Sequence, residues 1–305
     1  MPQTINTNLV SLNAQRNLST SQSSLATSMQ RLSSGLRVNG AKDDAAGLSI
    51  AERMNSQVRG MSVAMRNAND AISWTQTGEG ALGKVSDIFQ RMRELAVQSS
   101  NGSNTAADRV SLNQEFVQLA QEATRTLGGT QFNGLNVLAT TTDSTFQIGA
   151  NNTSTVDRIT VKAFDWTSTA NAGITDVLGS AVLVGTDVGT YNAATSTYTA
   201  GTDAPPALVT DAATAQTAIT NLDSAINSVN SQRATFGAVQ NRFENVVSNL
   251  MVASENQSAA RSRIMDADYA SETSNLSRAN ILQQAGNAMV AQANQLPQQV
   301  LALLR

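Results

Sequence analysis

Apolar residues recur at regular intervals at both ends of this chain. The N-terminal series is Leu18, Leu25, Met29, Leu32 and Leu36. The C-terminal series is Leu282, Met289, Leu296, Val300 and Leu303, interleaved with Ala279, Gly286 and Ala293. Spacings of three, four and seven residues are typical of helices that pack lengthwise on another helix. We therefore expect both ends to be helical and to pack on each other or on neighbouring molecules, as in an assembling subunit.

The same spacing predicts long helices in the middle of the chain. Residues 42–100 contain no proline and keep the pattern, which predicts a helix of about 90 Å at 1.5 Å per residue. A shorter helix is predicted over 105–127, and another long one from about residue 211, with one apolar seam that continues to Leu250. The sequence therefore predicts a mainly α fold, a long antiparallel helical hairpin or coiled-coil rod with paired terminal helices.

Between the long helices the pattern changes. Residues 130–166 contain a turn signal, Asn133-Gly134, and alternating segments typical of short strands, so we expect a small β-hairpin region there. Residues 167–209 are rich in Thr, Ala, Gly and Asp and show no sustained period. We expect them to form a short, variable, surface-exposed insertion at the distal end of the helices.

The composition excludes several classes of function. The 305 residues include no Cys and no His, which excludes thiolate metal sites and thiol nucleophiles and removes the commonest general base. The net charge is −3, and no basic face supports nucleic-acid binding. No apolar run reaches the roughly 18 residues of a membrane span, and residues 1–17 lack the pattern of a signal peptide. We expect no nucleic-acid binding and no membrane insertion.

Two motifs could suggest chemistry, but their context favours a structural role. Residues 78–84 have the spacing of a nucleotide-binding loop, yet Val85 stands where Ser or Thr is needed and the preceding segment is helical. The carboxylate pairs are Asp43 with Asp44 and Asp266 with Asp268. Both pairs lie at predicted helix boundaries, where carboxylates interact with free backbone N–H groups. We therefore expect no catalytic site, no cofactor and no metal.

Several strings at both ends closely resemble bacterial flagellin. They are residues 32–39 (LSSGLRVN), 41–47 (AKDDAAG), 130–134 (TQFNG), 261–264 (RSRI), 266–270 (DADYA), 281–286 (ILQQAG) and 300–305 (VLALLR). The resemblance spans roughly 1–165 and 211–305 and leaves 167–209 unmatched. It implies a structural subunit that polymerises into the bacterial flagellar filament for motility and is located outside the cell.

The resemblance also implies an organisation and a set of partners. It places residues 1–41 and 262–305 in a terminal coiled-coil domain in the inner filament core. Residues 42–166 and 210–261 would form the rod domain, and 167–209 the exposed insertion. The subunit would be exported unfolded by the flagellar type III apparatus and become ordered at its termini on assembly. Its partners would be other copies of itself, the flagellar cap, the hook-junction proteins and an export chaperone.

A further implication concerns vertebrate hosts. Residues 90–98 (QRMRELAVQ) resemble the patch by which flagellins are recognised by Toll-like receptor 5, and Glu115 stands at the matching place on the next helix. The resemblance thus names Arg91, Leu95 and Glu115 as receptor-recognition residues. The alternative is that these residues chiefly make filament contacts, and the two roles are compatible because the receptor patch overlaps the assembly surface. For the whole chain, the alternatives are a hook–filament junction protein and another helical surface protein.

Overall fold

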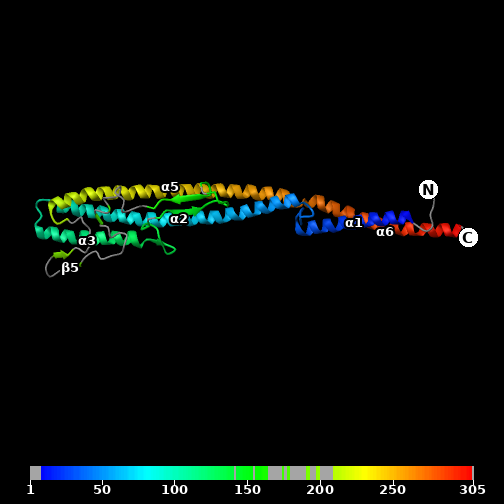
Figure 1. Cartoon of the computed structure of the whole chain (residues 1–305), viewed down its shortest axis with the longest axis horizontal. Coiled ribbons are helices and arrows are strands. Elements are labelled where there is room, and N and C mark those ends of the chain that lie inside the picture. Colours follow the sequence, from blue (N-terminus) through cyan, green and yellow to red (C-terminus); the bar gives the residue numbers. More distant parts are fainter. Residues whose placement is uncertain are drawn as a thin grey trace. The chain divides into compact units, whose positions relative to one another are not determined.

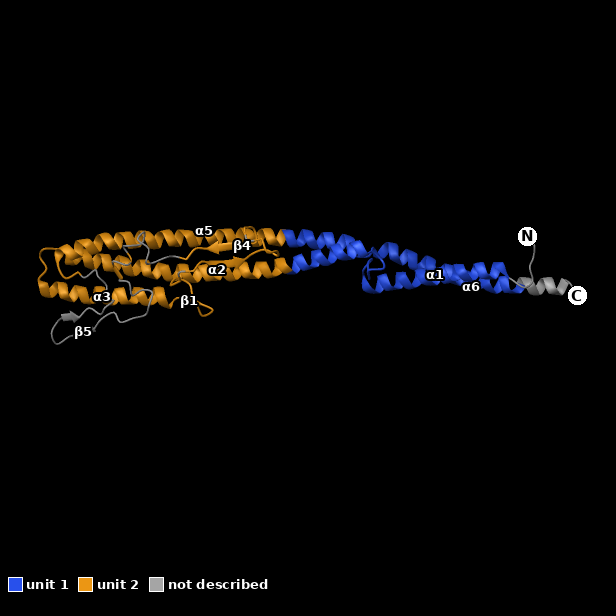
Figure 2. Cartoon of the chain, in the orientation of Figure 1, with its two compact units in different colours: residues 1–59, 253–305 blue, residues 60–252 orange. Residues whose placement is uncertain are grey.

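The structure is a computed structural model, and it is mainly α-helical, as the sequence predicts (Figure 1). It describes residues 8–140, 142–153, 155–163, 174, 177, 178, 190–192, 197–199 and 209–303, without the side chains of 190–192, 197–199 and 296–303. The chain divides into two compact units (Figure 2). Unit 1 comprises residues 1–59 and 253–305, and unit 2 comprises residues 60–252.

The helix bounds agree closely with the predicted ones. The helices are α1 (Leu9–Ser34), α2 (Ala45–Ser99), α3 (Ala106–Gly129), α5 (Ala212–Met265) and α6 (Tyr269–Leu303). Polar side chains mark their starts: Asp44 Oδ1 accepts a hydrogen bond from Gly47 N at 2.8 Å, and Asp211 Oδ1 accepts one from Thr214 N at 2.8 Å. Thr105 and Asp108 form a reciprocal capping box at the start of α3.

In unit 1, a short β-bridge joins the segment that follows α1 to the segment that follows α5. α1 ends at Gly35, whose φ of 71° is a left-handed conformation that glycine adopts without strain. Leu36 then pairs with Asp266 as an isolated antiparallel bridge, supported by Arg37 N donating to Met265 O at 2.6 Å. The guanidinium of Arg37 also donates to Ile264 O. These bonds hold the end of α5 beside the segment that follows α1.

In unit 2, the predicted apolar seams of α2, α3 and α5 form one core. Its largest fully buried side chains include Phe89, Phe116, Phe236 and Phe243. Trp74 makes edge-to-face contacts with Phe146 and Phe236, with ring centroids 5.5 and 5.8 Å apart. Gly78 is also part of this packing, because a Cβ atom there would lie 2.7 Å from Phe236 Cε2. The glycine thus allows close packing inside an unbroken helix.

The β-hairpin region is also confirmed. β1 (Gln131–Phe132) pairs with β2 (Leu135–Asn136), and β3 (Ser144–Gln147) pairs with β4 (Arg158–Val161), both antiparallel. Asn133 and Gly134 form the turn between β1 and β2 with φ of 50° and 76°. A third antiparallel pair joins β5 (Thr190–Asn192) and β6 (Thr197–Thr199).

The predicted insertion needs a correction at the residues that can be placed. Most of 167–209 lies outside the described residues. Within it, Ile174, Val177, Leu178 and Val209 are at most 1% exposed and belong to the core of unit 2. Ser99 Oγ donates to Val209 O at 2.7 Å, and Val209 N donates to Asn113 Oδ1 at 3.0 Å. These four residues are therefore part of the hydrophobic core and are not surface-exposed, because they fill space beside the long helices.

Candidate interaction surfaces

The terminal helices α1 and α6 are antiparallel partners within unit 1 (Figure 2). Asn8 begins α1, since its Oδ1 accepts from Ser11 N at 3.0 Å, while its Nδ2 donates to Ala293 O at 2.7 Å. Ser11 Oγ adds a hydrogen bond of 2.8 Å to Asn294 Oδ1. Sequence analysis missed these polar anchors, although an Asn directly before the first apolar residue of a helix is a recognisable helix-start signal.

Small residues of α6 face α1. Ala279 and Ala293 are buried, and a Cβ atom at Gly286 would lie 3.1 Å from Leu18 Cδ1. By contrast, Leu282 is 50% exposed and Met289 is 59% exposed. The interleaved small series therefore faces α1, and the large apolar series is only partly covered by it. Leu296, Val300 and Leu303 belong to the same predicted seam, but their side chains lie outside the described part of the chain.

The side chains of the N-terminal apolar series are more evenly buried than those of the C-terminal series. Leu18, Leu25 and Leu32 are half-buried, and so is Leu36 beyond the end of α1. Met29 is the exception, with 57% of its surface exposed. Ser11 and Ser28 are the buried residues of α1, so its contact with α6 combines small polar and medium-sized apolar side chains.

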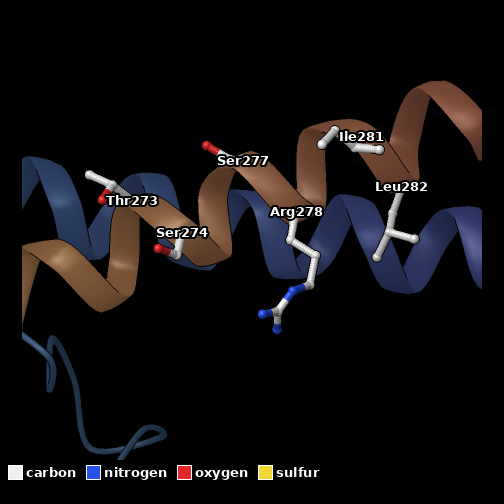
Figure 3. A pocket seen from close by; sticks show the side chains of 6 residues that line it. All are labelled: Thr273, Ser274, Ser277, Arg278, Ile281 and Leu282. Atoms are coloured by element: carbon white, nitrogen blue, oxygen red, sulfur yellow. The ribbon is translucent and has the colours of Figure 1, made fainter.

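Large apolar side chains consequently remain on the outside of the terminal pair. They are Leu9, Val10, Leu12, Met29, Ile281, Leu282 and Met289. Figure 3 shows the part of α6 where Ile281 and Leu282 lie next to Ser277 and Arg278, at the edge of a hollow that Thr273 and Ser274 also line. Leu282 also borders two further hollows, both lined by residues of α1 as well. An apolar surface of this kind, bordered by hydroxyl groups, is suited to pack against another protein.

Charged groups are sparse on this pair. The Arg31 guanidinium lies 3.9 Å from the Glu272 carboxylate, which is largely buried between the helices. The Tyr269 hydroxyl donates to Leu32 O at 3.2 Å, close to the bridge between Leu36 and Asp266. With few charges to repel one another, copies of this surface can approach closely.

The second surface lies in unit 2, where α2 and α3 carry an ion-pair cluster. Arg91 Nε donates to Glu115 Oε1 at 2.9 Å, and Arg91 NH1 donates to Glu94 Oε2 at 2.9 Å. Hydrogen bonds to the Glu94 carboxylate first, and then to Glu115, raise the pKa of Arg91 above its ordinary value. All three side chains are about half exposed or more, so the cluster is presented to solvent in a fixed arrangement.

Leu95 is placed differently from the other two predicted recognition residues. It is 1% exposed and belongs to the core of unit 2 together with Met92 and Phe116. A side chain buried to this extent cannot contact a partner that binds the surface formed by α2 and α3. The structure therefore brings Arg91 and Glu115 together on the surface and makes Leu95 a packing residue below them. Sequence analysis missed the neighbouring ion pair between Arg93 and Asp223, which are separated by 130 residues.

The carboxylate pairs have structural partners. Asp43 Oδ2 accepts from Asn39 N and Gly40 N, and Asp268 Oδ1 accepts from Ala270 N at 3.0 Å near the start of α6. Within the described residues there is no cluster of three or more Asp or Glu side chains able to hold a metal ion. No helix in the described part is long and apolar enough to cross a membrane.

Comparison with known proteins identifies the family. Residues 5–143 match the bacterial flagellin N-terminal helical region, and residues 219–304 match the bacterial flagellin C-terminal helical region. The chain is 44% identical to flagellin of Halalkalibacterium halodurans over 302 residues, covering 99% of both chains.

Two further relatives are similar over their full length. Flagellin of Serratia marcescens is 43% identical over 352 residues, with 100% of both chains covered. The flagellar filament 33 kDa core protein of Treponema phagedenis is 41% identical over 313 residues, with 99% of both covered. Paired terminal helices, long central helices and these matches at both ends lead to one conclusion: this chain belongs to the bacterial flagellin family.

Proposed function

We propose that this chain adds to a flagellar filament through the outer surface of its terminal helix pair, and that the pair becomes fully ordered by that packing. Flagellins are structural proteins that polymerise with themselves into the extracellular filament, and they are not enzymes. The observation that carries the proposal is the division of side chains on α6. Small residues face α1, whereas Ile281, Leu282 and Met289 remain largely exposed.

Two helices that bury mainly small side chains gain little free energy from each other. Isolated helices are marginal in water, and burial of a large apolar side chain contributes roughly 1.5 to 3 kcal/mol. The apolar groups that could supply this free energy are on the outside of the pair. Packing against other copies would bury them, so we infer that assembly orders residues 1–41 and 262–305, the predicted inner domain.

Substitution of the exposed apolar residues tests this proposal. Ile281→Gln with Met289→Gln keeps helix propensity and removes two side chains that are largely exposed in the subunit. If both become buried in the filament, the critical concentration for polymerisation rises by roughly tenfold or more for each. The matched control is Asn280→Gln with Gln284→Asn, at exposed polar positions of the same helix. The critical concentration of each protein is measured by sedimentation. Equal critical concentrations for the Ile281/Met289 variant and the control variant would contradict the proposal.

Hydrogen exchange tests the ordering separately. In the free subunit we expect weak protection of amides in α1 and α6 and strong protection in α5 within unit 2, where the seam is buried. In filaments all of these amides are protected. Equal protection of α1 in subunit and filament would show that the termini fold without partners.

We also propose that the chain is exported unfolded by the flagellar type III apparatus, with the cap, hook-junction proteins and an export chaperone as partners. The absence of Cys supports this route, because no disulfide can lock a fold before passage. Expression in a flagellated host with and without a working export apparatus tests it. The protein should reach the medium only in the first host.

A second proposed function is recognition by Toll-like receptor 5 through Arg91 and Glu115. The supporting observation is the exposed cluster in which Arg91 bridges α2 and α3, because an exposed guanidinium held in place by two carboxylates suits a charge-assisted contact. Arg91→Ala should reduce the potency of the free subunit on receptor-bearing cells by roughly tenfold or more if it is a central contact. Arg125→Ala is the matched control, since Arg125 is an exposed arginine of α3 paired with Glu122.

The outcomes separate recognition from folding. Circular dichroism should show both variants as helical as the parent. Equal signalling by parent and Arg91→Ala would place recognition elsewhere, and a silent parent subunit would show that the patch does not serve as a receptor site. The alternative of a hook–filament junction protein is tested by electron microscopy, because a junction protein should not grow long filaments from purified subunits.

A further inference from the structure

The chain contains three Asn-Gly dipeptides, and the structure places them in three different environments. They are Asn39-Gly40, Asn101-Gly102 and Asn133-Gly134. An asparagine before glycine is chemically fragile, because glycine has no Cβ atom to shield its backbone nitrogen from the neighbouring side chain. That nitrogen can attack the side-chain carbonyl carbon when the two approach. Whether they can approach depends on the fold.

Asn101 has the environment that favours this reaction. It lies in the exposed turn between α2 and α3, and Ser103 N donates to its Oδ1 at 3.4 Å. This bond directs the side chain forward along the backbone, over the Gly102 peptide, and polarises its carbonyl group. Within the described part of the chain, neither Gly102 N nor Asn101 Nδ2 has a hydrogen-bond partner. Both the attacking and the leaving nitrogen are therefore free.

Asn39 has the opposite environment. Its Nδ2 donates to Leu36 O at 3.0 Å, which holds the side chain back toward the preceding residues. The attacking nitrogen is engaged as well, because Gly40 N donates to Asp43 Oδ2 at 3.2 Å. Reaction here would need both hydrogen bonds to break.

Asn133 is restrained by its backbone. Its φ of 50° is left-handed, and the pairing of Phe132 with Leu135 on either side of the turn maintains that conformation. In the left-handed region the nitrogen of the next residue points away from the Cβ atom of the asparagine. Gly134 N is therefore turned away from the group that it would have to attack.

We propose that Asn101-Gly102 is a site of spontaneous deamidation in the folded protein, and that Asn39 and Asn133 are protected by the fold. The Gly102 nitrogen forms a bond to the side-chain carbon of Asn101 and loses its proton, and the Asn101 side-chain nitrogen leaves as ammonia. The product is a five-membered succinimide. Water then adds to one of its two carbonyl groups and opens the ring to aspartate or isoaspartate, so that ammonia is released and water consumed.

The modification would change the end of α2. Arg109 closes that end by donating from Nε to Ser99 O at 3.0 Å and from NH2 to Asn101 O at 3.1 Å. Isoaspartate adds a methylene group to the backbone at residue 101 and displaces the carbonyl group that Arg109 binds. Aspartate leaves the backbone unchanged and adds only a negative charge near this arginine. The two products therefore affect the turn differently.

Peptide mapping by mass spectrometry tests the proposal. The folded full-length protein is incubated at mildly alkaline pH and sampled over time, and a second sample is incubated in concentrated urea. We expect several-fold more deamidation at Asn101 than at Asn39 or Asn133 in the folded protein, and similar extents at all three sites in urea. Deamidation at Asn39 or Asn133 as fast as at Asn101 in the folded protein would overturn the proposal. So would the same ranking in urea, because local sequence would then explain it.

Gly102→Ala provides the matched variant. A Cβ atom at this position would meet no atom within 4 Å, so the variant should fold like the parent. Its added methyl group should slow deamidation at Asn101 several-fold and leave the rates at Asn39 and Asn133 unchanged. An unchanged rate at Asn101 in this variant would exclude attack by the residue 102 nitrogen.

Discussion

Gly286 of α6 lies against Leu18 of α1 at a distance that only a very small residue allows. A Cβ atom at Gly286 would be 3.1 Å from Leu18 Cδ1 and 3.6 Å from Leu18 Cβ. This close approach lets the two helices pack while the larger apolar residues of α6 remain on the outside. The side of α6 that carries Gly286 therefore faces α1, and the side that carries the larger apolar residues is exposed to a partner.

Enlarging residue 286 should separate the terminal helices. Gly286→Leu introduces a side chain that Leu18 cannot accommodate, and overpacking of this kind costs about 1 to 3 kcal/mol. We expect polymerisation to require a markedly higher subunit concentration, measured by sedimentation. Gly286→Ala is the control, because a small shift of the Leu18 side chain can accept one methyl group. Normal assembly of the leucine variant would show that this helix contact is not maintained in the filament.

A second glycine contact can be tested in unit 2. Gly78→Ala would place a Cβ atom 2.7 Å from Phe236 Cε2 and 2.9 Å from Val137 Cγ1, both within the buried core. We expect unit 2 to lose about 1 to 3 kcal/mol of unfolding free energy. Gly80→Ala is an informative control, since its Cβ atom meets nothing within 4 Å and alanine favours helix by up to about 1 kcal/mol. Thermal unfolding should therefore move in opposite directions for the two variants.

The long helices could be predicted from the sequence because their apolar period is continuous. The heptad residues of α5, such as Leu222, Val229, Phe236 and Phe243, are all buried in unit 2. The turn at Asn133-Gly134 and the strands β3 and β4 were also predictable, because their signals depend on a few neighbouring residues. Periodicity and turn chemistry are local properties, so they remain visible in the sequence.

Three features could not be predicted, and the first two depend on distant parts of the chain. Periodicity identified both series on α6 but could not show that the small one, Ala279, Gly286 and Ala293, faces α1. It also could not show that Leu95 is turned inward while Arg91 is exposed, although both are on α2. The burial of Ile174, Val177 and Leu178 was missed because the segment 167–209 shows no sustained period that would mark which of its apolar residues are buried.

The capping box of α3 should make this region sensitive to acid. Hydrogen bonds from the Thr105 hydroxyl first, and from its backbone N–H, lower the pKa of Asp108 below its ordinary value. A lowered pKa in the folded state means that the stabilisation is present above the unfolded value, about 3.9, and is lost as the pH falls through the folded value. Asp108→Asn should thus lower the melting temperature at pH 7. The difference from the parent should shrink as the pH falls below the unfolded value of about 3.9.

A difference that stays constant through this pH range would show that the Asp108 charge is not what stabilises the start of α3. A carboxylate at another helix start provides an independent comparison. Asp211→Asn serves that purpose, since hydrogen bonds from Thr214 also lower the pKa of Asp211 at the beginning of α5. It should show the same dependence on pH.

The segment 167–209 should prove only partly dispensable. Replacing residues 179–208 with a short Gly/Ser linker removes none of the side chains that the structure places in the core, so unit 2 should stay folded and filaments should form. Replacing 167–208 also removes Ile174, Val177 and Leu178, which are at most 1% exposed. Loss of one such buried side chain to alanine costs about 2 to 5 kcal/mol, so Ile174→Ala alone should lower the unfolding free energy measurably. If the two linker proteins were equally stable in urea denaturation, the whole segment would have to lie on the surface and not in the core.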